Sequence, residues 1–380
     1  MIVIAHHSFQ YYTYRQNYFK LNLFLYKVQC NLLNWRNLEF MKNKPVCLGS
    51  GLVALDVIYK DAKTRPNFLA GGSCGNVLTI LSFLGWDSYP IARLGSDNEG
   101  KRVIEDMMKW KVKTKFIEQD SRIHSPRIIE RIFEGKKPKH RFYLKCDHGN
   151  WLPHRKTFLL KSLETIQNNF PQSNVFYFDR ASPSALEIAK IMKKQNAIIF
   201  FEPPKFLHDD VFLKCLQMAD VVKHCYDQSE DTKNSGIDIP LEIQTMGEEG
   251  LRYKAKFLGH KTWKEMNAYP VHNLVDEAGS GDWLTAGLIH VLCQHKSKYA
   301  PSEKKLEFAL QFGQAMAALN CKYIGARGIM YNLSKSKLFS LVEKTIKNNT
   351  TPIEITNTPY KSMKMESRFA SKCKVCLCAN

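Results

Sequence analysis

The sequence predicts an α/β fold whose central sheet is mostly parallel and flanked by helices. From Pro45 onward, β-rich runs alternate with amphipathic helical patterns, which is typical of strands joined by crossover helices. A chain of 380 residues with 44% hydrophobic residues can bury a substantial core. No run reaches the roughly 18 consecutive apolar residues that a membrane-spanning helix needs, so we expect a soluble protein.

The predicted elements follow one another in a regular order. Helices are identified by apolar residues that recur every three or four positions, and strands by short apolar or alternating runs. Strands are expected in VCLGSGLVAL from Val46, NVFYFD from Asn174, AIIFFE from Ala197, ADVVKH from Ala219 and LEIQTMG from Leu241. Helices are expected in SALEIAKIMKKQ from Ser184, DVFLKCLQM from Asp210 and KKLEFALQFGQAMAAL from Lys304.

The stretch from Lys113 to Tyr143 has a different pattern. Its alternating runs KTKFIEQ, SPRIIERIFEG and HRFYLKC are separated by polar turns, which predicts extra antiparallel strands that project from the main sheet. We expect one domain over residues 41–345 with a small lid, whose strands lie around residues 60–70 and 113–145. Such a lid could cover a substrate.

The two ends of the chain stand apart from this domain. Residues 1–40 contain many aromatic and Asn residues but neither a signal peptide nor a strand pattern, so we interpret them as an N-terminal extension or the product of an upstream start codon. Residues 346–380 are expected to form a C-terminal tail that carries a cysteine cluster.

Charge and cysteine usage limit the possible partners. The formal charge of +19 would attract polyanions, but the basic residues are spread along the chain and lack the aromatic interleaving of a strand-binding surface. Nucleic acid is therefore the less favoured partner. The 11 cysteines are mostly isolated in apolar segments, as Cys74, Cys215, Cys293 and Cys321 are, which indicates reduced, buried thiols and favours a cytoplasmic location.

The segment DEAGSGDWLTAGLIHVL from Asp276 carries the strongest chemical signal. Its small-residue turn Gly279, Ser280 and Gly281 leads into an apolar helix, so backbone N–H groups and the positive end of the helix dipole meet at one point. Such a point can hold the charge that develops on a transferring phosphoryl group. Asp282, in the first turn, could accept a proton as a general base. The alternative is an ordinary helix cap.

A second segment, LAGGSCGNVLTILSFLGW, suggests a site for a polyol. Gly71 and Gly72 allow the backbone to approach a ligand closely, and Asn76 at the mouth of the following helix offers both a donor and an acceptor. Asp56 lies at the end of the first predicted strand, where a carboxylate could bind two neighbouring hydroxyls. A turn-forming role for Asp56 is the alternative.

A third segment, TMGEEG, follows a predicted strand. Thr245, Gly247 and Gly250 would let the main chain turn close to nucleotide phosphates, although the same pattern occurs in common β-turns.

The three segments, in this order and spacing, resemble the ribokinase-like (PfkB) family of sugar and nucleoside kinases. That family has a GG-x-x-x-N segment before a helix and a D-T-x-G-A-G-D segment in its C-terminal third, which stand here as GGSCGN and DEAGSGD. The similarity spans about Pro45 to Gly328.

The resemblance implies a three-layer sandwich with a β-strand lid, in which Mg-ATP phosphorylates a hydroxymethyl group of a sugar or nucleoside. Asp282 would then be the catalytic base, and the amides of Gly279, Ser280 and Gly281 the anion hole. The implied acceptor residues are Asp56, Gly71, Gly72 and Asn76, and the implied nucleotide residues are Thr245, Gly247, Gly250 and Asp276. A homodimer formed through the lid is a further expectation.

The sequence departs from the family pattern at two places. Many members carry an Asn-x-x-Glu motif that helps to organise magnesium, but here KHCYDQSE has Cys225 at the Asn position. Asp227 or Glu230 could substitute as oxygen ligands, or the segment could be a surface turn. Glu277 replaces the usual Thr at the rim of the anion hole.

Several other residues were weighed as ligands. The tail residues Cys373, Cys376 and Cys378 form a CxxCxC cluster that could bind zinc with Cys146 or His148, although free cysteines are the favoured interpretation. Arg93 and Arg327 could contact phosphate, with structural roles favoured for both.

The sequence leaves the acceptor open. The hydrogen-bonding residues Asp56 and Asn76 favour a sugar, because no base-stacking residue can be assigned. A nucleoside kinase is the first alternative. A non-catalytic protein that senses a sugar or nucleotide is the second, although an intact Asp282 opposes it.

Overall fold

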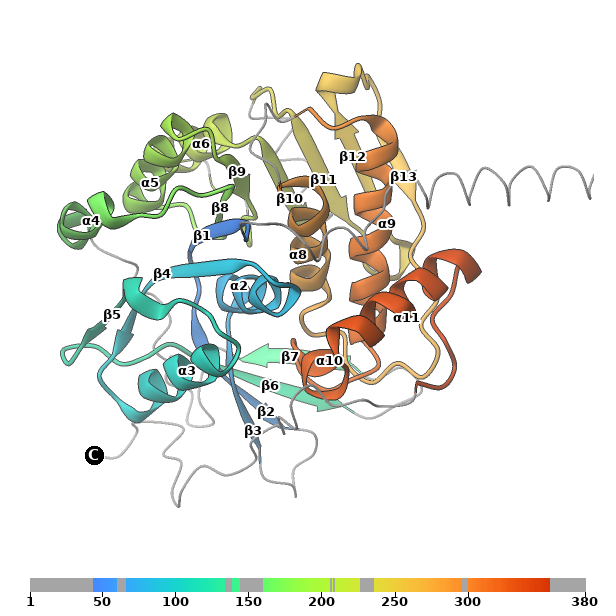
Figure 1. The fold of residues 1–380 in the computed structure, drawn as a ribbon, viewed down its shortest axis with the longest axis horizontal. Helices are drawn as coiled ribbons and strands as arrows, with labels where there is room; N and C mark the ends of the chain where they lie inside the picture. Colours follow the sequence, from blue (N-terminus) through green and yellow to red (C-terminus); the bar gives the residue numbers. More distant parts are fainter. Residues whose placement is uncertain are drawn as a thin grey trace, which may run out of the picture. The chain divides into compact units, whose positions relative to one another are not determined.

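A nine-stranded sheet forms the centre of the described structure (Figure 1). The computed structural model describes residues 44–59, 66–133, 139–143, 160–205, 207, 209–225, 236–294 and 300–355. The chain divides into two units, Met1–Lys44 and Pro45–Asn380, and the account below concerns the second.

The large sheet is parallel except at one edge. From β11 to β5 each strand runs parallel to its neighbours, whereas β12 and β13 are antiparallel. This confirms the predicted mostly parallel sheet. In spatial order its strands are β13 (Lys264–Met266), β12 (Leu251–Ala255), β11 (Leu241–Thr245), β10 (Val221–Cys225), β9 (Ile198–Phe201), β8 (Val175–Phe178), β1 (Val46–Ser50), β4 (Asp87–Gly95) and β5 (Ile117–Asp120).

A second, four-stranded sheet has the order β3 (Asn67–Gly71), β2 (Ala54–Tyr59), β6 (Arg127–Phe133) and β7 (Lys139–Tyr143). Strands β2 and β6 are parallel and the other two pairs are antiparallel. One face of this sheet packs Leu55, Val57 and Ile129 against a cluster that includes Val103 and Met107 of α3 (Asn98–Lys109). This face is buried.

The structure corrects two details of the predicted strands. The run VCLGSGLVAL is two strands in different sheets, because the chain turns at Gly51, where an added Cβ would overlap the side chain of Asp179. The KTKFIEQ run contributes β5 to the large sheet, parallel to β4, and does not join the small sheet. The nine-residue strand β4 was not predicted, because Pro90 and Arg93 interrupt its apolar pattern.

Helices cover both faces of the large sheet, as a three-layer fold requires (Figure 1). On one face lie α4 (Leu160–Ile166), α5 (Pro183–Lys194) and α6 (Asp210–Met218). On the other face α2 (Ser73–Leu84) contacts β1 and β4, and α8 (Ser280–Leu292) lies against α2 and α9 (Glu303–Asn320). The shorter α10 (Gly328–Asn332) and then α11 (Lys335–Asn348) follow, both in contact with α9.

Local sequence signals set the helix boundaries. The side chains of Asp97, Ser182, Asp209, Ser302 and Ser334 each accept a hydrogen bond from a first-turn N–H group, which satisfies one of the donors that a helix start leaves free. By contrast, α2 and α8 start at glycines without a side-chain cap. The N–H groups at these two helix starts are thus kept clear of a capping side chain.

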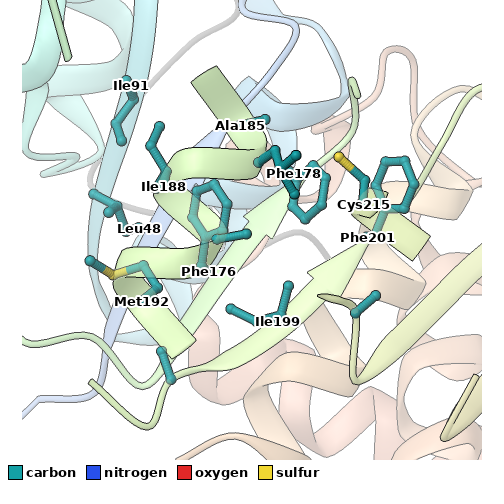
Figure 2. Packing of buried hydrophobic residues seen from close by; sticks show 14 of the residues in the cluster. Leu48, Ile91, Phe176, Phe178, Ala185, Ile188, Met192, Ile199, Phe201 and Cys215 are labelled. Carbon is teal, nitrogen blue, oxygen red and sulfur yellow. The ribbon is translucent and has the colours of Figure 1, made fainter. Parts of the chain in front are cut away.

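Aromatic residues dominate the core on the α5–α6 side (Figure 2). Phe178 of β8 stacks on Phe201 of β9 with ring centroids 4.4 Å apart, and Phe176 lies 5.3 Å from Phe178. The strands are fully buried, which explains why they read as continuous apolar runs and not as alternating ones.

Helices α8 and α9 approach each other closely on the opposite face. A Cβ added to Gly287 would lie 2.6 Å from the Cα atom of Gly313, so small residues at both positions permit the contact. Among the described residues, Cys47, Cys74, Cys215, Cys293 and Cys321 are buried free thiols, which confirms the expectation for these cysteines. In the same ranges, no helix has the length and apolar character needed to cross a bilayer.

Phe201→Ala should lower the free energy of unfolding by about 3 to 5 kcal/mol, because it removes a stacked ring and leaves a cavity. Urea denaturation measures the loss. Met108→Ala is the control, since Met108 is 58% exposed and its truncation should change stability by no more than about 0.5 kcal/mol. Equal losses in the two variants would contradict this description of the core.

Candidate active site

The predicted catalytic segment and the predicted acceptor segment meet at the starts of α8 and α2. Asn76, in the first turn of α2, donates from Nδ2 to Oδ2 of Asp282, in the first turn of α8, across 2.8 Å. The two residues are 206 positions apart in the chain. The structure therefore brings Asp282 and Asn76 together as one unit.

The turn before α8 is held in a conformation that favours glycine. Gly279 has a φ of 73°, in the left-handed region, and an added Cβ would overlap the backbone of Ala326. Trp283 Nε1 donates to the Ala326 carbonyl across 3.0 Å. We call residues 276–281 the anion turn, and its floor is formed by the segment that contains Ala326.

Two buried polar side chains hold the anion turn against that segment. Asp276 is 1% exposed and accepts from the N–H groups of Ala278 at 3.0 Å and Gly325 at 2.7 Å. Asn320 donates to the carbonyls of Ala278 at 3.1 Å and Gly325 at 3.3 Å. Both oxygens of Asp276 are engaged within the protein, which gives it a role in fixing the turn.

The helix start supplies donors for an anion. The first N–H groups of an α-helix have no intrahelical acceptor, and α8 carries Gly281 and Asp282 at this position. The Ser280 N–H donates to the Glu277 carbonyl across a long 3.2 Å, so it must give up this weak bond to bind an anion. The anion turn is therefore suited to phosphate oxygens, with Gly281 better poised than Ser280.

An ion pair lies beside the carboxylate of Asp282. Lys223 of β10 pairs with Glu202, which follows β9, and Thr285 Oγ1 donates to the same carboxylate across 2.7 Å. A Cβ added to Gly281 would lie 3.5 Å from Lys223 Nζ. The Lys223 side chain is 4% exposed, so its charge acts in a poorly hydrated environment next to the anion turn.

Burial sets the protonation of Asp282. It raises the pKa of Asp282 well above the usual range, and the negative charge of Glu202 raises it further. The hydrogen bond from Asn76 and the charge of Lys223 act in the opposite direction. A carboxylate with a raised pKa is a stronger base than an ordinary surface aspartate, as proton abstraction from a hydroxyl requires.

The predicted acceptor residues surround the start of α2. Gly72 has a φ of 76° and closes the turn before the helix, while the carboxylate of Asp56 lies so near Gly71 that an added Cβ would overlap it. Asp179, after β8, accepts from Leu52 N at 2.9 Å, from Cys74 N at 3.1 Å and from the Ser73 hydroxyl. The buried Asp179 thus shapes the turn that Asp56 faces.

Several buried polar atoms on the acceptor side have no hydrogen-bond partner among the described residues. They include Oδ1 of Asp56, Oδ1 of Asn76 and Oε1 of Glu130. Burial raises the pKa of Asp56 to about 7 and that of Glu130 to about 10, the latter also through the negative charges of Asp276 and Asp56. Buried polar atoms are nearly always paired in folded proteins, so these atoms indicate a polar ligand.

The predicted nucleotide residues lie at the carboxyl ends of β10 and β11. Thr245 is opposite Cys225 in the parallel register, and its hydroxyl lies 3.8 Å from the Cys225 sulfur. Gly247 has open space around its Cα, whereas an added Cβ at Gly250 would overlap the backbone at Met266. The TMGEEG segment is therefore a tight turn with one open glycine at the sheet edge.

Some predicted ligands cannot be placed. Asp227, Glu230, Cys146, His148 and the tail cysteines Cys373, Cys376 and Cys378 lie outside the described residues. In the described ranges no group of three or more His, Cys, Asp or Glu side chains could hold a metal ion. Arg93 is buried and pairs with Asp120 and, at 3.6 Å, with Glu118, which confirms its structural role.

Comparison with known proteins agrees with this geometry. The sequence profile of pfkB family carbohydrate kinases matches residues 43–331. The chain belongs to this family. It is therefore a member of a kinase family, as its two glycine segments indicated.

Individual relatives are distant in sequence but similar in fold. An uncharacterized sugar kinase of Pyrococcus horikoshii is 24% identical over 242 residues, 58% of this chain and 72% of the relative. Its structure in complex with ATP has a TM-score of 0.56 at 22% identity and covers 74% of this chain and 93% of that one.

Two further structures have TM-scores of 0.60. A fructokinase of Vibrio cholerae O395 with fructose, ADP and calcium bound is 16% identical and covers 79% of this chain and 99% of its own. An aminoimidazole riboside kinase of Salmonella enterica, in complex with its riboside and an ATP analog, is 15% identical and covers 78% and 99%. These likenesses establish the fold of this kinase.

Sequence reasoning missed several polar residues of the kinase site. Asp179, Glu202 and Lys223 each lie at the carboxyl end of a parallel strand that was predicted correctly. Ligand sites in open α/β sheets lie outside the carboxyl ends of the strands, so the last polar residue of each apolar run was a usable signal. Asn320, at the end of α9, had no such signal.

Lys223→Met should lower the free energy of unfolding by about 3 to 5 kcal/mol, because it leaves the charge of Glu202 without its partner in a largely buried site. Urea denaturation measures the change. Lys190→Met is the matched control, since Lys190 pairs with Glu187 at 2.6 Å but both side chains are nearly half exposed. The control should change stability by less than about 1 kcal/mol, and an equal loss in both would contradict the assigned burial.

Proposed function

We propose that this kinase transfers the γ-phosphoryl group of ATP to a hydroxyl of a small sugar, with Asp282 as the general base. The hydrogen bond between Asn76 and Asp282 carries this proposal, because it places the base between the acceptor residues and the anion turn. The ATP-bound structures of similar fold support ATP as the donor.

The proposed reaction needs one proton transfer and one displacement. The acceptor hydroxyl gives its proton to a carboxylate oxygen of Asp282, and the hydroxyl oxygen forms a bond to the γ-phosphorus as the bond to ADP breaks. The N–H groups at the start of α8 and the Lys223 cation balance the negative charge on the phosphoryl group and the leaving ADP. Gly279 and Gly281 serve by bringing the backbone close.

The polar atoms of the acceptor side favour a polyol. Oδ1 of Asp56, Oδ1 of Asn76 and Oε1 of Glu130 are buried and lack partners within the described ranges, and hydroxyl groups can satisfy them. Asp56 and Asn76 would bind neighbouring sugar hydroxyls. The structure of the aminoimidazole riboside kinase keeps a nucleoside as the second candidate acceptor, because the ribose of a nucleoside offers similar hydroxyls.

Magnesium is proposed to enter with the nucleotide. Mg²⁺ in kinases is held by phosphates and water together with one or two carboxylates, so a cage of protein ligands is not required. Glu202 beside the anion turn has the right chemistry, although it also pairs with Lys223. Its role when the ion is bound would be to accept hydrogen bonds from magnesium-bound water. The predicted lid-mediated homodimer and the zinc site stay predictions.

Asp282→Asn should reduce kcat by about 10² to 10⁴, the factor that a positioned general base contributes, with nearly unchanged ATP affinity. Coupled ADP release with Mg-ATP is measured against a panel of sugars, sugar phosphates and nucleosides. Normal turnover in the variant would refute the assignment of the base. No turnover of the wild type on any acceptor, with ligand binding still detectable, would favour the sensing function.

The pH profile should report the raised pKa of Asp282. Because the base acts in its ionised form, kcat/KM should rise with pH on an acid limb that lies above the usual range of an aspartate. Asn76→Ala removes the hydrogen bond that stabilises the ionised form, so it should move this limb to higher pH and raise the KM for the acceptor by about tenfold. A change in the ATP dependence alone would contradict this placement.

A further inference from the structure

Arg327 links the anion turn to the acceptor side of the site. It directly follows Ala326, the residue that packs under Gly279, and its side chain is 1% exposed. From there its guanidinium reaches β3, where Nη2 donates to the carbonyl of Ala70, the residue before Gly71. One side chain thus connects the floor of the anion turn with the turn that shapes the acceptor side.

A buried carboxylate completes this connection. Asp106 of α3 accepts from Arg327 Nη2 at 2.7 Å and from the Ala70 N–H at 3.0 Å, and the Tyr331 hydroxyl lies 3.4 Å from its other oxygen. Both backbone polar groups of Ala70 are therefore fixed, one by Asp106 and one by Arg327. The Arg327 Nη1 group keeps its donors free of any partner in the described part of the chain.

The charge of Arg327 also acts on Asp56. Burial raises the pKa of Asp56 to about 7, and the positive charge of Arg327 is the largest influence in the opposite direction, followed by the Gly72 N–H. The other ionisable group that faces Asp56 is Glu130 of β6, which is hydrogen-bonded to Asp276 and has a pKa of about 10. Glu130 is therefore neutral at pH 7, which leaves Arg327 as the charge that decides the state of Asp56.

We propose that Arg327 is a positioning residue that keeps Asp56 ionised, so that Asp56 can accept hydrogen bonds from two neighbouring hydroxyls of the acceptor. This inference rests on the proposed function. An ionised carboxylate accepts hydrogen bonds at both oxygens, whereas a protonated one gives up part of that capacity to its own proton. Arg327 thereby tunes the acceptor side without contact with the transferred phosphoryl group.

The first experiment needs no ligand. The melting temperature is measured from pH 4 to pH 9 for the wild type, Asp56→Asn, Arg327→Gln and the double variant. Because the pKa of Asp56 is raised from 3.8 to about 7 on folding, its ionisation destabilises the fold progressively between these values. In the wild-type background, the advantage of Asp56→Asn should therefore grow over this range and level off above pH 7.

In the Arg327→Gln background the same advantage should continue to grow above pH 7, because loss of a nearby positive charge raises the pKa of Asp56 by about one unit or more. Arg327→Lys retains the charge and should restore the wild-type curve in part. Curves that level off at the same pH in both backgrounds would overturn the proposal. If Arg327→Gln does not fold, the comparison is made between Arg327→Lys and the wild type.

The second experiment uses D-fructose and D-ribose as acceptor probes. Arg327→Gln should raise the KM for the phosphorylated sugar by about tenfold at pH 7 and move its pH dependence to higher pH, with the KM for ATP unchanged. Arg93→Gln is the control, because it removes another buried guanidinium that pairs with carboxylates of β5 and its neighbourhood. An unchanged acceptor KM in Arg327→Gln would overturn the proposal.

The two experiments separate the two claims. If the wild type phosphorylates neither sugar nor any other acceptor, the proposed function fails, and the melting curves still decide whether Arg327 controls the ionisation of Asp56. If turnover is found and the melting curves coincide, the proposed function stands and the role of Arg327 is refuted.

Discussion

The hydrogen bond between Asn76 and Asp282 is the contact on which the candidate site depends. It joins the first turns of two helices that start at glycines and point toward the same edge of the large sheet. Both helix starts are uncapped by side chains, so their N–H groups are available to a ligand. The close packing of α2 on α8 fixes the distance between the acceptor residues and the anion turn.

The electrostatics of the site come from strand ends. Asp179, Glu202 and Lys223 follow buried apolar runs, where the protein can place charges in a poorly hydrated environment only by pairing them. Lys223 compensates Glu202, and the backbone N–H groups of the acceptor turn compensate Asp179. Asp282 is compensated incompletely, which raises its pKa and makes it suitable as a base.

The small sheet contributes more to the site than a cover. Its strand β2 supplies Asp56 and its strand β6 supplies Glu130, and the parallel register of β2 and β6 places both side chains on the same face. The opposite face is buried against α3. Through Asp106 and Arg327, α3 and the segment under the anion turn both hold strand β3, so the small sheet is tied to the chemistry at the large one.

The sequence by itself determined the fold class, the two glycine segments and the choice of Asp282 as the base. These features are local: an apolar period identifies a strand or a helix, and a glycine turn before a helix creates an anion site wherever it occurs. The assignment of segments to sheets was less accurate, because the split at Gly51 and the place of β5 depend on which distant strand each segment pairs with.

Only the tertiary structure decided which charges act together. Asp276 holds the anion turn because Gly325, 49 positions away, presents its N–H group, and Arg327 acts on Asp56 across more than half of the chain. No local pattern encodes these pairs, since each is created when burial removes water from two segments at once and leaves them to satisfy each other. The ionisation of Asp56 and Asp282 is likewise a property of the packed site, because removal from water sets it.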